Sequence, residues 1–379
     1  MRTRTIIGLL ATVTLTGGAL VACSSSADTS DGSTTGTAAC PQATVNPPGG
    51  NPPAGGAAGP TFAKTVAPSD TSTSTVIDGS GPEIQCGRTP LKATNDIVYD
   101  SPTSGGRQVP LKLDLQVPLT AGAKPLVVYL TGGQFSNASK AGNLDQRTYV
   151  AEQGYAVAGI EYRTVRNGAT YKEIVADVKS AIRFLRAHAA EYGIDPAKVA
   201  VWGQSAGGYL AAMTGVTNGR AEFEGTGNPG QSSDVQAVVD EFGPADIAKI
   251  AADFDAAAQK SNHTPGNALA QVIFGAGTKL SVEDEPAVTK GADPATYVGA
   301  SDPSFLFLHG SADQLVSPSQ TLTLHNALRA EGADTTRYVV QGGNHGDLSL
   351  MTGDTNAANQ WSSQQVMGNI VSFLAKHLG

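Results

Sequence analysis

The sequence predicts an α/β protein in which a mostly parallel sheet of eight strands carries helices on both faces. Short, continuous apolar runs recur along the chain, and such runs are typical of strands buried on both faces. Helical patterns lie between these runs, and strands that alternate with helices form a parallel sheet covered on both sides. The length of 379 residues allows one large α/β domain or two, and eight strands in one alternating series favour one. The formal charge of −8 argues against a nucleic-acid binder that depends on a basic stripe.

The first 22 residues are predicted to be an export signal. Two arginines precede an apolar stretch over residues 6–21, which is short for a membrane span and has the length of a signal-peptide core. The stretch ends in Leu-Val-Ala-Cys over residues 20–23, which resembles the lipobox of bacterial lipoproteins. We therefore expect cleavage before Cys23, lipidation of Cys23 and an extracytoplasmic protein anchored in the cell membrane. Ordinary secretory cleavage without lipidation is the alternative.

The next segment is predicted to be a tether. Residues 24–82 contain 36 Pro, Gly, Ser and Thr among 59 positions and hardly any large apolar side chain. Such a segment cannot bury enough surface to offset the entropy lost on ordering. We therefore predict a lipidated cysteine and disordered tether over residues 23–82 and one folded domain over residues 83–379. Cys40 and Cys86 are an even pair in an oxidising compartment, so we expect a disulfide between them.

The domain is predicted to begin with an antiparallel hairpin of residues 96–99 and 111–117, joined by a turn-rich segment. Six buried strands follow, at residues 126–130, 155–160, 199–202, 235–239, 305–308 and 337–340. Helices are predicted between or after them, at residues 171–192, 206–213, 319–329 and 359–377. The segment 245–297 lies between two strands and is expected to cover the binding pocket.

A candidate nucleophile follows the strand at residues 199–202. The chain continues there as Gly203-Gln204-Ser205-Ala206-Gly207 and then enters an apolar helix. The pattern G-x-S-x-G between a strand and a helix is the nucleophile elbow, a tight turn that exposes the serine at the sheet edge. The five residues alone are a weak signal, but the strand–turn–helix setting predicts Ser205 as the nucleophile.

A serine hydroxyl needs a base to take its proton, and that base is usually a histidine oriented by a carboxylate. Asp313 follows the strand at residues 305–308 and His345 follows the strand at residues 337–340, so the order serine, acid, histidine suits the elbow. We therefore predict Ser205, Asp313 and His345 as a catalytic triad. His309 lies too close to its own strand to be the base and is expected to have a structural hydrogen-bonding role.

Backbone N–H groups near the elbow are expected to form an oxyanion hole. One belongs to Ala206, at the N-terminus of its helix, and the others belong to Gly132 and Gly133, in the loop after the strand at residues 126–130. A simple strand-ending glycine turn is the alternative for this loop. Gln134, Phe135 and Gln204 are the expected substrate-binding residues.

These segments together resemble the esterase/lipase branch of the α/β-hydrolases, specifically the BD-FAE-like group of acetyl and feruloyl esterases. The resemblance extends from about Asn95 to the C-terminus. Besides the elbow it includes residues 161–163, 181–186, 192–196, 230–233, 235–240, 243–246 and 302–303. It implies an α/β-hydrolase fold and a serine carboxylesterase with no metal or other cofactor. The implied substrates are acetyl, short-chain acyl or feruloyl esters, either small molecules or linked to a polysaccharide. We expect no nucleic-acid partner and no obligate protein partner.

The oxyanion loop departs from the pattern of the group, which usually has His-Gly-Gly followed by another glycine. Thr131 replaces the histidine and Gln134 replaces the last glycine, so we expect a changed rate and substrate preference. Two other functions share the elbow: a serine peptidase of the prolyl-oligopeptidase kind, which usually has a large extra domain, and a non-catalytic envelope binding protein on the same fold.

Overall fold

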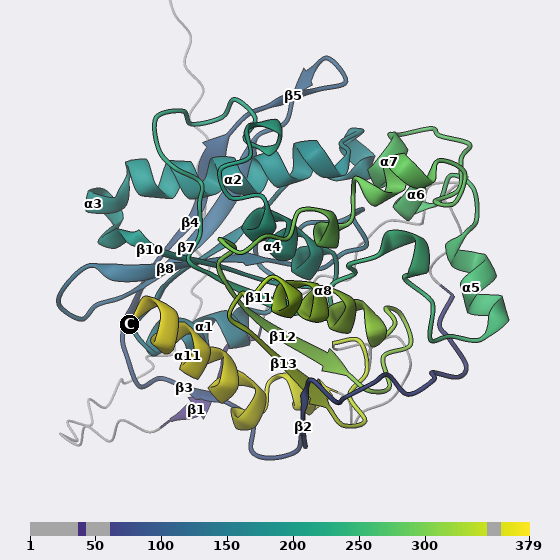
Figure 1. Cartoon of the computed structure of the whole chain (residues 1–379). Coiled ribbons are helices and arrows are strands. Elements are labelled where there is room, and N and C mark those ends of the chain that lie inside the picture. The colour runs from purple at the N-terminus through teal and green to yellow at the C-terminus, as the bar shows by residue number, and fades with distance from the viewer. Residues whose placement is uncertain (1–36, 43–60, 347–357) are drawn as a thin grey trace, which may run out of the picture. The chain divides into compact units, whose positions relative to one another are not determined.

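The centre of the molecule is a sheet of nine strands, ordered β2-β13-β12-β11-β10-β8-β9-β7-β4 (Figure 1). The computed structural model describes residues 37–42, 61–346 and 358–379. β7 is antiparallel to both of its neighbours, and the remaining neighbours are parallel. The strands are β2 (Thr75–Ile77), β4 (Leu91–Asp100), β7 (Leu111–Pro118), β8 (Lys124–Leu130), β9 (Ala156–Ile160), β10 (Ile194–Gln204), β11 (Ala237–Glu241), β12 (Ser304–Gly310) and β13 (Thr335–Val340). The eight predicted strands are all present, and β2 is an addition to them.

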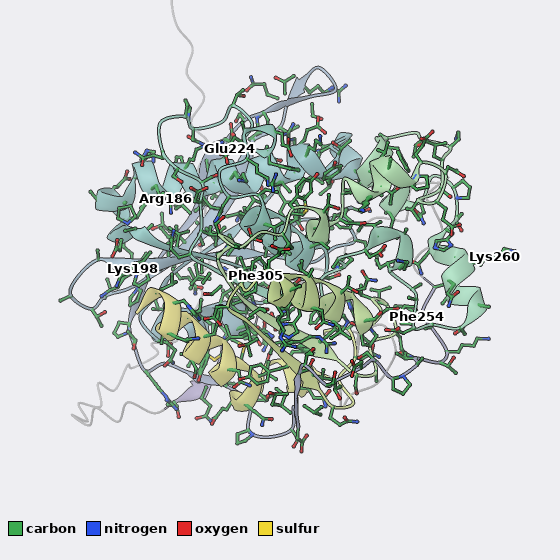
Figure 2. All side chains as sticks on the ribbon, viewed as in Figure 1. Arg186, Lys198, Glu224, Phe254, Lys260 and Phe305 are labelled. Atoms are coloured by element: carbon green, nitrogen blue, oxygen red, sulfur yellow. A yellow bond between two sulfur atoms is a disulfide. The ribbon has the colours of Figure 1, made fainter. Side chains whose placement is uncertain are left out.

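The central strands are apolar on both faces because helices cover both faces. In β8, Leu126 and Val128 pack into the hydrophobic cluster on one side, whereas Val127 and Tyr129 pack into the cluster on the other. Alternate residues of a strand point to opposite faces, so a continuous apolar run supplies both clusters. Phe305 of β12, labelled near the centre of Figure 2, stacks on Phe307 inside the first cluster.

Helices α2 (Tyr171–Ala187), α4 (Ala206–Val216) and α8 (Ser319–Ala330) cover one face, and α1 (Leu144–Glu152) and α11 (Gln364–Leu378) cover the other (Figure 1). The predicted helix at residues 171–192 is divided at His188 into α2 and α3 (Ala189–Tyr192), and Gly193 ends it in a left-handed conformation. The predicted last helix is also divided, because the Ser363 hydroxyl accepts the Val366 N–H and caps a new helix after α10 (Ala358–Trp361). No helix in the described part of the chain is long and apolar enough to cross a membrane.

Residues 61–82 correct the predicted tether, because they pack on the domain. β2 pairs in parallel with β13 at the edge of the sheet. Residues 61–67, which we call the N-terminal strap, hold Ala63 fully buried, and Ala63 exchanges hydrogen bonds with Gln314 at 2.9 and 3.0 Å. Val66 forms an isolated antiparallel β-bridge with Phe254, which Figure 2 labels beside α5 (Ala256–Asn262). Composition misled the prediction because backbone hydrogen bonds and a few apolar side chains, such as Ala63, Val66 and Ile77, are enough to fix this segment.

Cys40 and Cys86 form the predicted disulfide, beside the short antiparallel pair β1 (Ala38–Ala39) and β3 (Gln85–Cys86). The bond joins the segment 37–42 to the start of the domain. The predicted signal peptide, the lipidation site Cys23 and residues 43–60 of the predicted tether lie outside the described residues.

Short elements make up much of the rest of the described chain. They are β5 (Thr103–Ser104), β6 (Arg107–Gln108), η1 (Val165–Asn167), η2 (Ala221–Phe223), η3 (Ile247–Lys249), α6 (Ala268–Phe274), α7 (Pro286–Lys290) and η4 (Pro294–Thr296). With α5, the elements from η3 to η4 make up the predicted cover segment 245–297.

Candidate active site

Ser205 lies in the tight turn between β10 and α4, with φ 55° and ψ −121°. A residue other than glycine rarely adopts positive φ, and holding such a residue in this conformation costs about 1–3 kcal/mol. Glycines make the turn possible: a Cβ at Gly203 would lie 2.2 Å from the Gly207 carbonyl oxygen, and a Cβ at Gly207 would lie 2.0 Å from the Leu130 carbonyl oxygen. The Ser205 N–H donates to the Glu241 carbonyl at 2.9 Å. The surrounding backbone therefore holds the serine in the conformation of a nucleophile elbow.

The structure brings Ser205, Asp313 and His345 together, although Asp313 lies 108 positions after Ser205 in the sequence. The His345 Nε2 lies 2.8 Å from the Ser205 Oγ, and the His345 Nδ1 lies 2.7 Å from the Asp313 Oδ2. A carboxylate at Nδ1 selects the tautomer with its proton on Nδ1, which leaves Nε2 free to accept the serine proton. The three residues thus have the hydrogen-bonding pattern of a Ser-His-Asp triad.

Asp313 is fully buried and remains ionised because of its partners. Its Oδ1 accepts the backbone N–H groups of Leu315 and Val316 at 2.8 and 2.9 Å. Burial by itself raises the pKa of the Asp313 carboxyl, but electrostatic attraction to His345 and the hydrogen bonds from His309 and His345 hold that pKa well below its ordinary value. A permanent carboxylate is what the imidazole needs to stay oriented.

His309 has the predicted structural role, and its partner is the acid itself. The ring is fully buried, and burial lowers the pKa of His309, so the ring is neutral. Its Nδ1 lies 2.9 Å from the Thr321 hydroxyl, and its Nε2 lies 3.0 Å from the Val316 carbonyl and 3.3 Å from the Asp313 Oδ2. Since Thr321 already accepts from Arg337, its hydroxyl proton can donate to Nδ1, and the Nε2–H then points at Val316 and Asp313. His309 therefore helps to position Asp313.

The predicted oxyanion loop lies against the nucleophile. A Cβ at Gly132 would lie 3.1 Å from the Ser205 Cβ, and Gly133 turns with φ 154°. Gln134 and Phe135 follow at φ 53° and 57°, in the left-handed region that glycine adopts more readily than other residues. Within the described part of the chain, no acceptor takes the N–H of Gly133 or of Ala206. Both donors are therefore available to a ligand.

Thr131, which replaces the histidine of the related group, is buried, and its hydroxyl lies 3.2 Å from the Gly132 carbonyl, which accepts its proton. Tyr162 donates to the Thr131 carbonyl at 2.5 Å. The loop is therefore fixed by hydrogen bonds at its start even without a histidine.

The predicted substrate contact of Gln204 is wrong. Its side-chain amide donates to the Gln146 Oε1 at 2.9 Å and to the Glu241 Oε2 at 3.0 Å, in a buried network that Trp202 joins. Consecutive residues at the end of a strand point to opposite faces, so Gln204 points away while Ser205 faces the cavity.

A cavity of about 320 Å³ opens beside Ser205 and Ala206. Gln134 and Phe135 line it, as predicted, and the cover segment also contributes, as predicted. Its remaining lining residues are Thr61, Ser136, Arg166, Pro244, Ile250, Ser261, Asn262, Asn267, Ala268, Leu269, Leu315 and Val316. Sequence reasoning missed Thr61, which had been assigned to the tether. It also missed Arg166, although Arg166 follows a strand end at the edge where ligands bind.

Metal-ligating side chains do not gather in this cavity or elsewhere in the described part of the chain: no group of three His, Cys, Asp or Glu residues there has the arrangement of a metal site.

The sequence of the domain is similar to those of known esterases. Residues 113–328 match the BD-FAE family model. The chain is 28% identical over 229 residues to Esterase LipC of Mycobacterium tuberculosis, which covers 59% of this chain and 53% of that protein. It is 29% identical over 254 residues to the isoprenylcysteine alpha-carbonyl methylesterase ICME of Arabidopsis thaliana, which covers 65% of this chain and 56% of that protein. The chain thus spans about half the length of these curated relatives.

A similar solved structure is a truncated form of a carbohydrate esterase from gut microbiota. It superposes with a TM-score of 0.63 at 26% identity, over 76% of this chain and 97% of that chain. The likeness includes the mostly parallel sheet and the helices on both of its faces.

Proposed function

The chain belongs to the BD-FAE family of α/β-hydrolases, and from this premise we propose that it is a serine carboxylesterase that works through an acyl-enzyme. The observation that carries the proposal is the pair of hydrogen bonds that joins Ser205 to His345 at 2.8 Å and His345 to Asp313 at 2.7 Å, in the wall of a cavity. A serine with a base and an orienting acid in this order has the arrangement needed for acyl transfer.

In the proposed mechanism, the Ser205 Oγ attacks the ester carbonyl carbon while the His345 Nε2 takes its proton. Asp313 holds the imidazole and stabilises the imidazolium that forms. The N–H groups of Ala206 and Gly133 donate to the oxyanion of the tetrahedral intermediate, and the positive end of α4 adds to their effect. His345 then protonates the leaving alcohol. In deacylation it takes a proton from water, whose oxygen attacks the acyl carbon and releases the acid.

The cavity is large enough to hold a small-molecule ester. A volume of about 320 Å³ is near the lower limit of small-molecule sites. We propose acetyl, short-chain acyl or feruloyl esters, either free or attached to a polysaccharide. The likeness to a carbohydrate esterase supports the polysaccharide-linked class.

We further propose that the protein is exported and anchored to the membrane by lipid on Cys23. The lipobox-like residues 20–23 support this location, and the disulfide between Cys40 and Cys86 suits an oxidising compartment. Metabolic labelling with an alkyne fatty acid tests it, because Cys23→Ser should abolish both the label and recovery in the membrane fraction. Equal labelling of the two proteins would refute the lipid anchor.

The esterase proposal is tested by hydrolysis of p-nitrophenyl acetate together with a fluorophosphonate probe. Ser205→Ala should lose nearly all hydrolysis and all labelling. Ser80→Ala, which changes an exposed serine outside the cavity, is the matched control and should keep both. A native protein that the probe does not label would be a non-catalytic binding protein, and labelling with turnover of peptides but not esters would indicate a peptidase.

A further inference from the structure

The cavity beside Ser205 is lined by one charged side chain among the described residues. Arg166 is the only residue with a charged side chain among the described residues that line it. The others are apolar or neutral, such as Gln134, Ser136, Asn262 and Asn267. A single cation in the substrate cavity of a chain with a formal charge of −8 therefore needs an explanation.

The guanidinium of Arg166 has no partner within the described part of the chain. Its side chain is exposed, no Asp or Glu there forms a salt bridge with it, and no acceptor there takes its N–H groups. Nearby Arg163 differs, because it forms an ion pair with Asp177 at 2.7 Å. Arg166 therefore keeps the donors of its guanidinium for a ligand.

The backbone of Arg166 is fixed relative to the nucleophile. Arg166 lies in η1, and the N–H of the preceding Val165 donates to the Phe135 carbonyl at 2.9 Å. This bond ties η1 to the oxyanion loop. A capping box closes the turn, in which the Thr164 N–H donates to the Asn167 Oδ1 at 3.0 Å. The base of the arginine side chain is thus held on the same scaffold as the oxyanion hole.

We propose that Arg166 binds a carboxylate of the substrate, so that the enzyme prefers esters that carry a negative charge near the bond it cleaves. A guanidinium matches the planar geometry of a carboxylate and binds it with two parallel hydrogen bonds. No other charge lines the cavity among the described residues, so none there competes for the guanidinium. This inference rests on the proposed esterase function. The carboxylate belongs either to the acyl part or to the alcohol part of the ester.

Matched pairs of esters test the proposal and separate the two possibilities. For the acyl side, mono-p-nitrophenyl succinate is compared with p-nitrophenyl butyrate. For the alcohol side, 4-acetoxybenzoate is compared with its methyl ester. The readout is the ratio of kcat/KM for the charged ester to that for its neutral partner, measured for the native protein, Arg166→Gln and Arg166→Lys. Arg88→Gln is the control, because it removes the same charge from an exposed position outside the cavity.

We expect Arg166→Gln to lower this ratio by about three- to tenfold for one pair, since the guanidinium is exposed and its hydrogen bonds are charge-assisted. Arg166→Lys should recover part of the ratio, and Arg88→Gln should leave it unchanged. The pair that responds identifies the side of the ester that carries the charge. Ratios for both pairs that are the same in the native protein and Arg166→Gln would overturn the inference. If the native protein hydrolyses none of the four esters, the proposed esterase function fails instead.

Discussion

Replacement of Asp313 by Asn is the most direct test of how the triad is held. The amide is isosteric with the carboxylate, but one of its oxygens becomes an NH2 group. The Leu315 and Val316 N–H groups lie 2.8 and 2.9 Å from Oδ1, so they require an acceptor at that position. The amide oxygen must therefore face them, and its NH2 group must face the His345 Nδ1, 2.7 Å away.

This orientation reverses the tautomer of His345. Nδ1 becomes the acceptor, so the ring proton moves to Nε2, 2.8 Å from the Ser205 Oγ, and Nε2 can no longer accept the serine proton. A wrong tautomer with intact geometry lowers kcat by about 10⁴, which corresponds to about 5.5 kcal/mol in the activation barrier. The binding of substrate should change far less, because no substrate contact is removed.

The assay is steady-state hydrolysis of p-nitrophenyl acetate, with urea unfolding to show that the variant is folded. Asp302→Asn is the matched control, since Asp302 accepts the Gly299 N–H in a turn away from the triad. If Asp313→Asn keeps its kcat within about tenfold of the native value, Asp313 does not set the tautomer and the reasoning fails.

Three further predictions concern stability and are checked by urea unfolding. Gly207→Ala should destabilise the protein by at least about 3 kcal/mol, because its Cβ would lie 2.0 Å from a backbone oxygen. Gly368→Ala, in α11 with open space around it, is the control and should be neutral or stabilising. Equal effects of the two substitutions would contradict the packing of the elbow. Cys40→Ala with Cys86→Ala should cost about 4 kcal/mol, since the disulfide closes a loop with a sequence separation of 46, and no loss would mean that the bond does not restrict the unfolded chain. Burial raises the pKa of Asp240 from 3.8 to about 7, so between these pH values the folded state keeps a proton on Asp240 that the unfolded state has lost. The contribution of Asp240 to the free energy of unfolding therefore falls as pH rises from about 4 to 7. Asp240→Asn should therefore be more stabilising at pH 8 than at pH 4, and a pH-independent difference would refute the shift.

The fold class was predictable from the sequence because the buried strands are continuous apolar runs. The edge strand β2 was not, since Thr75 and Val76 are exposed and the strand is held by backbone hydrogen bonds to β13, which leave no hydrophobic pattern. The start of α11 was missed for a similar reason, because the Ser363 cap decides it and the apolar periodicity continues through the break.

The triad was predictable because local sequence specifies it. Only glycine fits at Gly203 and Gly207, and the loops after two late strands must meet the elbow at the same edge of a parallel sheet. The side chain of Gln204 was assigned to the wrong face because the sequence does not show where the strand ends and the turn begins.

The sequence by itself determined the nucleophile elbow, the order of serine, acid and histidine, and the class of fold, since each depends on short-range patterns of glycine and apolar residues. Only the tertiary structure decided what surrounds the serine. Thr61, Arg166, Asn262 and Leu315 come from segments far apart in the chain, and they line one cavity because the strap, η1 and the cover segment pack together above the sheet. A cavity formed by such distant segments depends on packing, which no local pattern of residues encodes.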